Sequence, residues 1–264
     1  MTMMLRLLPF LFAAIAGPVA GVVAHAGQAR AAQQDGGAVP PPLIVNVDAD
    51  NAPFMSSRAG YPFGLYPAIL RVALSRCHDN VRIEAKPWKR AFVEIDKAHA
   101  GIGGLYKNSE RLARYDFSDP IHVENVVVYY RRAQPFEFRS AADLYGRKVG
   151  VLRGWSYGDD FDRASRDGSI ATEEVSSDRS NFLKLKDGRL DAVLAVEESG
   201  RANLAAEGML GIEPAGVLLA SSPAYLAFNK TAAKTELLGC FNKALLEMKR
   251  DGSFKRIVRE TLGE

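Results

Sequence analysis

The stretch NSERLARYDFSDP, residues 108–120, combines a helix start with a cation where helices ordinarily favour anions. Asn108 or Ser109 can act as the N-cap, and Glu110 suits the positive end of the helix macrodipole. Arg111 follows within the first turn. Its guanidinium, together with free backbone N–H groups, makes a site for a carboxylate.

Two interpretations of Arg111 stay open on this stretch alone. Gly104, just upstream, lets a ligand approach the backbone closely, which favours a binding site. The alternative is a surface arginine that pairs with Asp116 or Asp119.

The hydrophobic pattern around this stretch predicts alternating strands and helices. Before it we expect strands at 43–50, 81–88 and 101–106, helices at 64–77 and 89–100, and a loop at 51–54. A strand at 124–132 follows it. The order strand, helix, strand, helix, strand is typical of a parallel sheet covered by helices.

The same alternation of strands and helices begins again after residue 132. We expect strands at 147–154, 170–175, 189–199 and 224–230, and helices at 140–146, 156–167, 178–188, 199–209 and 235–262. Two extended segments, around 129–132 and 223–229, are placed to cross between the two units. The chain is therefore predicted to form an α/β fold with lobe 1 at 43–131 and 226–264, lobe 2 at 132–225, two crossing strands and an interlobe cleft.

The N-terminus differs in character from the rest of the chain. Arg6 precedes an apolar stretch at 7–24, and Ala24-His25-Ala26 fits an A-x-A cleavage site. We expect a secretory signal peptide at 1–26, with an uncleaved membrane anchor as the alternative. A disordered leader is expected at 27–42.

Composition excludes some function classes. The formal charge of the 264 residues is only +3 and is spread along the chain, so we expect no nucleic-acid partner. His78, His99 and His122 lack metal-ligand spacing, so we expect no metal and no cofactor.

Cys77 and Cys240 are the two cysteines of the chain. In an oxidising compartment they can form a disulfide. They can equally be two small buried residues, and their sequence separation does not decide between these alternatives.

Five segments resemble the solute-binding proteins of family 3, the polar amino-acid receptors of ABC importers. They are PWKRAFVEI (87–95), GGLYKNSERLARYDFSDPIHVENVVVYY (103–130), DLYGRKVGVLRGWSYGDDF (143–161), LKDGRLDAVLA (185–195) and ALLEMKRDGSFKRIVRETLG (244–263). The resemblance runs from about Leu43 to Gly263. It implies a periplasmic-binding-protein-like type II fold.

The resemblance also implies ligand-binding residues in lobe 1. Arg111 matches the arginine that grips the ligand α-carboxylate, and Asp48 matches an acidic position at the cleft edge. Trp88 matches a stacking aromatic residue, and Gly104 a glycine whose backbone meets the ligand. Tyr106 replaces a usual threonine or serine, which implies a narrower pocket.

In lobe 2 the chain both follows and departs from the family pattern. Trp155 and Ser156 lie in the turn that matches the family's Gly-Thr-Thr, and Ser156 keeps a hydroxyl beside helix N–H groups. Val196 stands where the family places an aspartate for the ligand ammonium. Either Glu197 reaches the same amine, or the ligand has no α-ammonium, or Glu197 and Glu198 are both solvated at a helix start.

These features together predict a periplasmic, monomeric receptor that closes on a small carboxylate-bearing solute and delivers it to the membrane permease of an ABC importer. The alternatives are an enzyme resembling the cyclohexadienyl dehydratases, with Glu197 or Glu198 as general acid, and a ligand-sensing domain.

Overall fold

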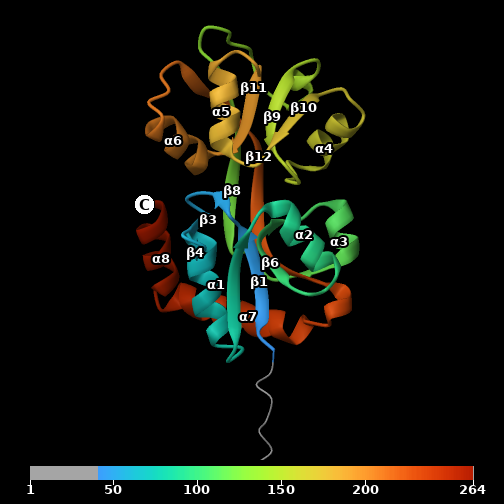
Figure 1. The fold of residues 1–264 in the computed structure, drawn as a ribbon, viewed down its shortest axis with the longest axis vertical. Coiled ribbons are helices and arrows are strands. Elements are labelled where there is room, and N and C mark those ends of the chain that lie inside the picture. The colour runs from blue at the N-terminus through green and yellow to red at the C-terminus, as the bar shows by residue number, and fades with distance from the viewer. Residues whose placement is uncertain (1–40, 264) are drawn as a thin grey trace, which may run out of the picture. The chain divides into compact units, whose positions relative to one another are not determined.

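The structure, a computed structural model, describes residues 41–263. The predicted signal peptide (1–26) and nearly all of the predicted leader (27–42) lie outside the described residues. Within residues 41–263, nine strands form one sheet in the order β10-β9-β11-β8-β12-β6-β1-β5, with β7 beside β12, and three more form a small sheet (Figure 1).

Lobe 1 is built from segments at both ends of the described chain. Its elements are β1 (Leu43–Asp48), β2 (Asp50–Asn51), β3 (Met55–Arg58), β4 (Tyr61–Phe63), α1 (Leu65–Ser75), β5 (Val81–Lys86), α2 (Trp88–Asp96), β6 (Gly101–Tyr106), α3 (Ser109–Arg114), β7 (Tyr115–Phe117), η2 (Lys230–Ala232), α7 (Thr235–Arg250) and α8 (Ser253–Leu262).

Lobe 2 repeats the strand-helix alternation. Its elements are η1 (Ala141–Leu144), β9 (Lys148–Leu152), α4 (Asp159–Arg166), β10 (Ala171–Val175), α5 (Asp178–Lys186), β11 (Ala192–Val196) and α6 (Glu197–Ala206). Its sheet has a hydrophobic core on each face, one packed against α4 and the other against α5 and α6 (Figure 1).

Two long antiparallel strands connect the lobes. β8 (His122–Arg131) pairs with the part of β12 (Ile212–Asn229) that runs from Ile212 to Ala224. The end of β12 pairs with β6 in lobe 1, and Val126–Tyr130 of β8 pair with β11 in lobe 2. The two-lobe type II fold predicted from the sequence is therefore confirmed.

The crossing point in β8 lies earlier than the predicted segment at 129–132. Val126 and Val128 already belong to the core of lobe 2, and their register sets Asn125 opposite Ser221 at the crossing. The lobe boundary at residue 131 stays a prediction. We propose that it lies nearer Asn125.

Three parts of the fold differ from the sequence-based prediction. The small sheet of β2, β3 and β4 was not expected, and β12 begins twelve residues before the predicted start at Ala224. α6 begins at Glu197 rather than Ser199, so Glu197 opens a helix instead of ending a strand. The C-terminal helical segment is interrupted at Gly252, which adopts a left-handed conformation between α7 and α8.

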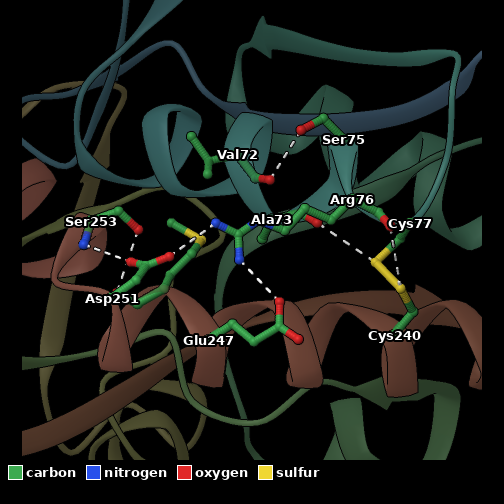
Figure 2. Close-up of polar contacts among 10 residues, drawn as sticks. Val72, Ala73, Ser75, Arg76, Cys77, Cys240, Glu247, Asp251 and Ser253 are labelled. Carbon is green, nitrogen blue, oxygen red and sulfur yellow. Dashed lines mark hydrogen bonds and ion pairs between the residues drawn. A yellow bond between two sulfur atoms is a disulfide. The ribbon is translucent and has the colours of Figure 1, made fainter.

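A disulfide joins α7 to the region just after α1, between Cys77 and Cys240 (Figure 2). Beside it, the Arg76 guanidinium forms ion pairs of 3.1 Å with Glu247 and 3.3 Å with Asp251 (Figure 2). These contacts hold the C-terminal helices against lobe 1, where the chain returns after crossing from lobe 2.

No helix within residues 41–263 combines the length and the apolar character that crossing a membrane requires.

Candidate functional site

The site lies where the carboxyl ends of parallel strands from the two lobes meet. β1, β5 and β6 run parallel in lobe 1, and β9, β10 and β11 run parallel in lobe 2. Ligands of open α/β sheets bind outside the carboxyl ends of the strands. Segments that follow these strands line two neighbouring cavities, which we call the arginine cavity and the aspartate cavity.

The arginine cavity has a volume of about 460 Å³ and is lined by Arg111, Phe92 and Asn108 from lobe 1 and by residues 151–157 from lobe 2. The aspartate cavity, about 300 Å³, is lined by Asp48 and Trp88 from lobe 1 and by Ser176 from lobe 2. The residues that line both are Lys89, Leu152, Arg153 and Trp155. The two cavities therefore flank Trp155.

Local helix capping positions Arg111. Asn108 has extended backbone angles, and its side chain accepts a hydrogen bond of 2.8 Å from the Arg111 backbone N–H. Of the two candidate caps, Asn108 is thus the one used. The Asn108 amide also donates to Ser156 Oγ across the cleft at 3.2 Å. The cap therefore orients α3 and contacts the opposite lobe.

The Arg111 guanidinium is buried between the lobes, with 8% of the residue exposed. It donates to the Tyr106 carbonyl at 2.9 Å and to the Gly154 carbonyl at 3.1 Å, and it lies 5.0 Å from the Phe92 ring centroid. Burial lowers the pKa of Arg111 to about 10, which still leaves it charged at neutral pH. The alternative of a surface arginine paired with Asp116 or Asp119 is wrong, because Arg111 faces the cleft.

Arg111 lacks an anionic partner of its own. None of the ion pairs formed among residues 41–263 includes it, and the nearby Asp162 acts on it only at longer range. A guanidinium has five N–H donors, and the two carbonyl contacts leave donors unused. A buried cation without an ion-pair partner is costly, so this arrangement favours an anionic ligand.

Aromatic residues from both lobes meet beside Arg111. The Trp155 ring lies 5.9 Å from Trp88 and 5.5 Å, edge to face, from Tyr106. Its indole N–H donates to Asp48 Oδ2 at 3.4 Å. The structure thus brings together four residues that the sequence singled out: Asp48, Trp88, Tyr106 and Trp155.

Asp48 is a buried carboxylate at the end of β1. Its Oδ1 accepts a hydrogen bond of 3.1 Å from the Asp50 backbone N–H. Burial, with a smaller contribution from the neighbouring Asp50, raises the pKa of Asp48 to about 6, although hydrogen bonds from the backbone and from Trp155 act in the opposite direction. Asp48 thus lines the aspartate cavity, whereas Arg111 lines the arginine cavity beyond Trp155.

Of three other predicted site residues, one lines a cavity and two lie outside both cavities. Ser156 lines the arginine cavity, where its hydroxyl donates to Asp162. Gly104 has a φ of 82° and lies against Tyr66, outside the residues that line either cavity. Glu197 also lies outside both linings, and its carboxylate is 3.6 Å from Arg201. A ligand contact by Gly104 or Glu197 stays a prediction.

Two buried acids were not predicted as site residues. Glu124, in the crossing strand β8, accepts hydrogen bonds from the hydroxyls of Tyr66 and Tyr106, the latter at 2.6 Å. Burial raises the pKa of Glu124 to about 7. Asp178, at the start of α5, is also buried, and burial raises its pKa to about 7. The sequence offers one signal for Glu124, which is that an acidic residue stands within the largely apolar strand HVENVVVYY (122–130).

Comparison with known proteins identifies the family. The model of the bacterial extracellular solute-binding proteins, family 3, matches residues 43–264. The chain belongs to this family. The predicted membership is confirmed, and the family consists mainly of binding proteins rather than enzymes.

Individual relatives are distant. The chain is 25% identical over 190 residues to the L-cystine-binding protein TcyJ of Escherichia coli (strain K12), covering 70% of each chain. It superposes on an ancestral arginine-binding protein bound to arginine with a TM-score of 0.72 and 24% identity, covering 83% of this chain and 97% of that one. It also superposes on an ancestral amino acid-binding protein described as a precursor of cyclohexadienyl dehydratase, with a TM-score of 0.68 and 20% identity, covering 84% and 95%.

Proposed function

We propose that this family member is a periplasmic receptor that captures a small carboxylate-bearing solute, a polar amino acid, and delivers it to the permease of an ABC importer. The main support is the buried Arg111 guanidinium, which lines a cavity of about 460 Å³ and has unused donors. A carboxylate accepts such donors in pairs, and water exclusion strengthens the contact.

Hinge closure is the motion we propose for capture. β8 and β12 are the strands that pass between the lobes, and both lobes contribute walls to the arginine cavity. Bending of these strands near Asn125 and Ser221 would open the cavity, and a solute that contacts both lobes would favour the closed form. The relatives named for L-cystine and arginine support an amino acid as solute.

Export through a cleaved signal peptide at 1–26 is part of the same proposal. It is supported by the apolar stretch and the A-x-A site in the sequence. The disulfide between Cys77 and Cys240 is consistent with an oxidising compartment.

A thermal-shift screen of the twenty amino acids and a set of small mono- and dicarboxylates tests the proposal. A solute at 100 times its Kd stabilises the folded state by about 2.7 kcal/mol, which corresponds to a rise in Tm of roughly 5–10 °C for a chain of this size. Small-angle scattering with the best solute should show a smaller radius of gyration. If no carboxylate raises Tm, the proposed function is wrong.

One observation favours a second candidate, an enzyme on this scaffold. The raised pKa values of Asp48, Glu124 and Asp178 would suit a general acid near neutral pH. Recovery of the bound solute and its analysis by mass spectrometry separates the two functions. A receptor returns the solute unchanged, whereas an enzyme returns a product.

A further inference from the structure

The hydrogen-bonding groups that the two cavities leave unused are donors. The Arg111 guanidinium has N–H donors beyond its contacts with the carbonyls of Tyr106 and Gly154. Trp88 lines the aspartate cavity, is 6% exposed, and its indole N–H has no acceptor among residues 41–263. Lys89 lines both cavities and takes part in none of the ion pairs formed within the described chain. The cavities therefore favour a solute that presents acceptors.

The two exposed acids that line the arginine cavity are already paired. Glu110 Oε1 lies 3.3 Å from Arg114 Nη1, and Glu174 Oε2 lies 3.6 Å from Arg153 Nε. All four residues line this cavity. Each of these acids is therefore offset by a cation of the same cavity, and neither is an unpaired partner for a positive group on the solute.

Asp162 is the third acid that lines the arginine cavity, and its contacts lie within lobe 2. One of its oxygens accepts a hydrogen bond from the Ser156 hydroxyl, and the other accepts one of 2.9 Å from the Tyr157 backbone N–H. Its charge also offsets that of Arg111 at longer range. A solute ammonium would have to compete with these contacts.

The acids of the other cavity lie beyond Trp155. Asp48 and Asp50 line the aspartate cavity but not the arginine cavity, whereas Trp155 lines both. The Asp48 carboxylate accepts hydrogen bonds from the Trp155 indole N–H at 3.4 Å and from the Asp50 backbone N–H at 3.1 Å. An ammonium on the carbon next to a carboxylate that binds Arg111 is therefore separated from both acids by Trp155.

Buried acceptors lead to the same result. Within residues 41–263, the buried side-chain oxygens that lack a hydrogen-bond partner belong to Asn46, Asp178, Asn181 and Glu198. None of these residues lines either cavity. A site built to bind an N–H group rejects analogues without it, because its own buried acceptors are then left unpaired. Among the described residues that line the cavities, no buried side-chain oxygen is unpaired, so a solute without an ammonium is not rejected.

We propose that this receptor does not bind the α-ammonium of its solute through an acid, and that 2-hydroxy and 2-oxo carboxylates are its solutes on the same terms as amino acids. The inference rests on the proposed function, from which it takes the contact between the solute carboxylate and Arg111. A hydroxyl or carbonyl oxygen on the second carbon can accept from the unused donors, whereas an ammonium cannot.

Isothermal titration with pairs of matched solutes tests the inference on the wild-type protein. The pairs are L-serine with L-glycerate, L-glutamate with L-2-hydroxyglutarate, and L-tyrosine with L-3-(4-hydroxyphenyl)lactate. Each pair keeps the carbon skeleton and the configuration and replaces only the ammonium by a hydroxyl. Loss of an ammonium held by an acid would weaken binding about tenfold or more. We expect the hydroxy acid of each pair that binds to match its amino acid within about threefold or to bind more tightly.

Two variants examine the acids that could hold an ammonium. Asp162→Asn and Asp48→Asn should each change the Kd of both members of a pair by the same factor, because neither carboxylate contacts the group in which the members differ. Asp187→Asn is the control, since its carboxylate pairs with Arg189 just after α5 and is exposed, and it should leave every Kd unchanged. A loss of affinity confined to the amino acids in either variant would overturn the inference.

The outcomes for the wild-type protein separate this inference from the proposed function. An amino acid that binds about tenfold more tightly than its hydroxy acid overturns the inference and leaves the proposed function standing. If the thermal-shift screen finds a different amino acid, the hydroxy acid of that amino acid makes the same decision. If no carboxylate binds at all, the proposed function is wrong, and the inference fails with it.

Discussion

Glu124 gives the protein a pH dependence that can be worked out from its surroundings. The carboxyl group is buried in the crossing strand β8 between the hydroxyls of Tyr66 and Tyr106. Burial raises its pKa from the usual 4.5 to about 7. The folded state therefore holds a proton that the unfolded state releases above pH 4.5, so this contribution to stability is present at low pH and is lost as pH rises through 7.

The magnitude follows from the size of that pKa change. Each pKa unit corresponds to about 1.4 kcal/mol, so ionisation of Glu124 removes on the order of 3 kcal/mol of stability between pH 4.5 and 8. Glu124→Gln keeps a neutral group of the same size that can still accept from one tyrosine and donate to the other. The variant should match the wild-type protein at pH 4.5 and exceed it by up to about 3 kcal/mol at pH 8.

Urea unfolding at the two pH values measures this difference. Because Asp48 and Asp178 titrate in the same range, the variant must be compared with the wild-type protein at each pH rather than across pH. Glu260→Gln, at an exposed position of α8, is the control and should show no pH-dependent gain. A gain for Glu124→Gln that is the same at pH 4.5 and pH 8 would refute the reasoning.

Three further predictions concern the frame around the cleft. Cys240→Ser removes the disulfide and should lower the free energy of unfolding by about 2–4 kcal/mol in urea titrations; a loss below about 0.5 kcal/mol would contradict it. Gly104→Ala places a Cβ 2.9 Å from the Tyr66 ring at a φ of 82° and should destabilise by about 1–3 kcal/mol, whereas an unchanged Tm would show that the backbone relaxes there. Trp155→Ala deletes two aromatic contacts and the Asp48 hydrogen bond between the lobes, so the balance should shift about tenfold toward open forms. A larger radius of gyration in small-angle scattering would show this shift, and an unchanged radius would contradict the prediction that the Trp155 contacts hold the lobes together.

Elements with a clear hydrophobic period were predictable from the sequence. α1 shows apolar residues at helical spacing, and in β1 β-branched residues alternate with polar ones. β2, β3 and β4 have only two to four residues each, too few for a period, and they exist through pairing with one another. β12 contains Pro214, Gly216 and Pro223, which ordinarily interrupt strands, and its pairing with β8 is irregular between Pro214 and Ala220.

The site residues that could be predicted are those whose position follows from the sequence around them. Arg111 follows an N-cap, and Asp48 ends a strand, so both could be placed from local sequence and the family resemblance. The contact between Trp155 and Asp48 could not, because it depends on how the two lobes face each other. Whether Glu197 takes the role of the missing aspartate was left open by the sequence, and its place in the first turn of α6 sets its carboxylate 3.6 Å from Arg201.

The central claim is that Arg111 binds the carboxylate of a solute in the cleft, and titration calorimetry with Arg111→Met tests it most directly. The solute is the best ligand from the thermal-shift screen, paired with its uncharged amide analogue, and Arg189→Met serves as a surface control. We predict that Arg111→Met binds the acid at least 30-fold more weakly than the wild-type protein and no longer distinguishes acid from amide. Wild-type affinity for the acid in Arg111→Met would contradict the account.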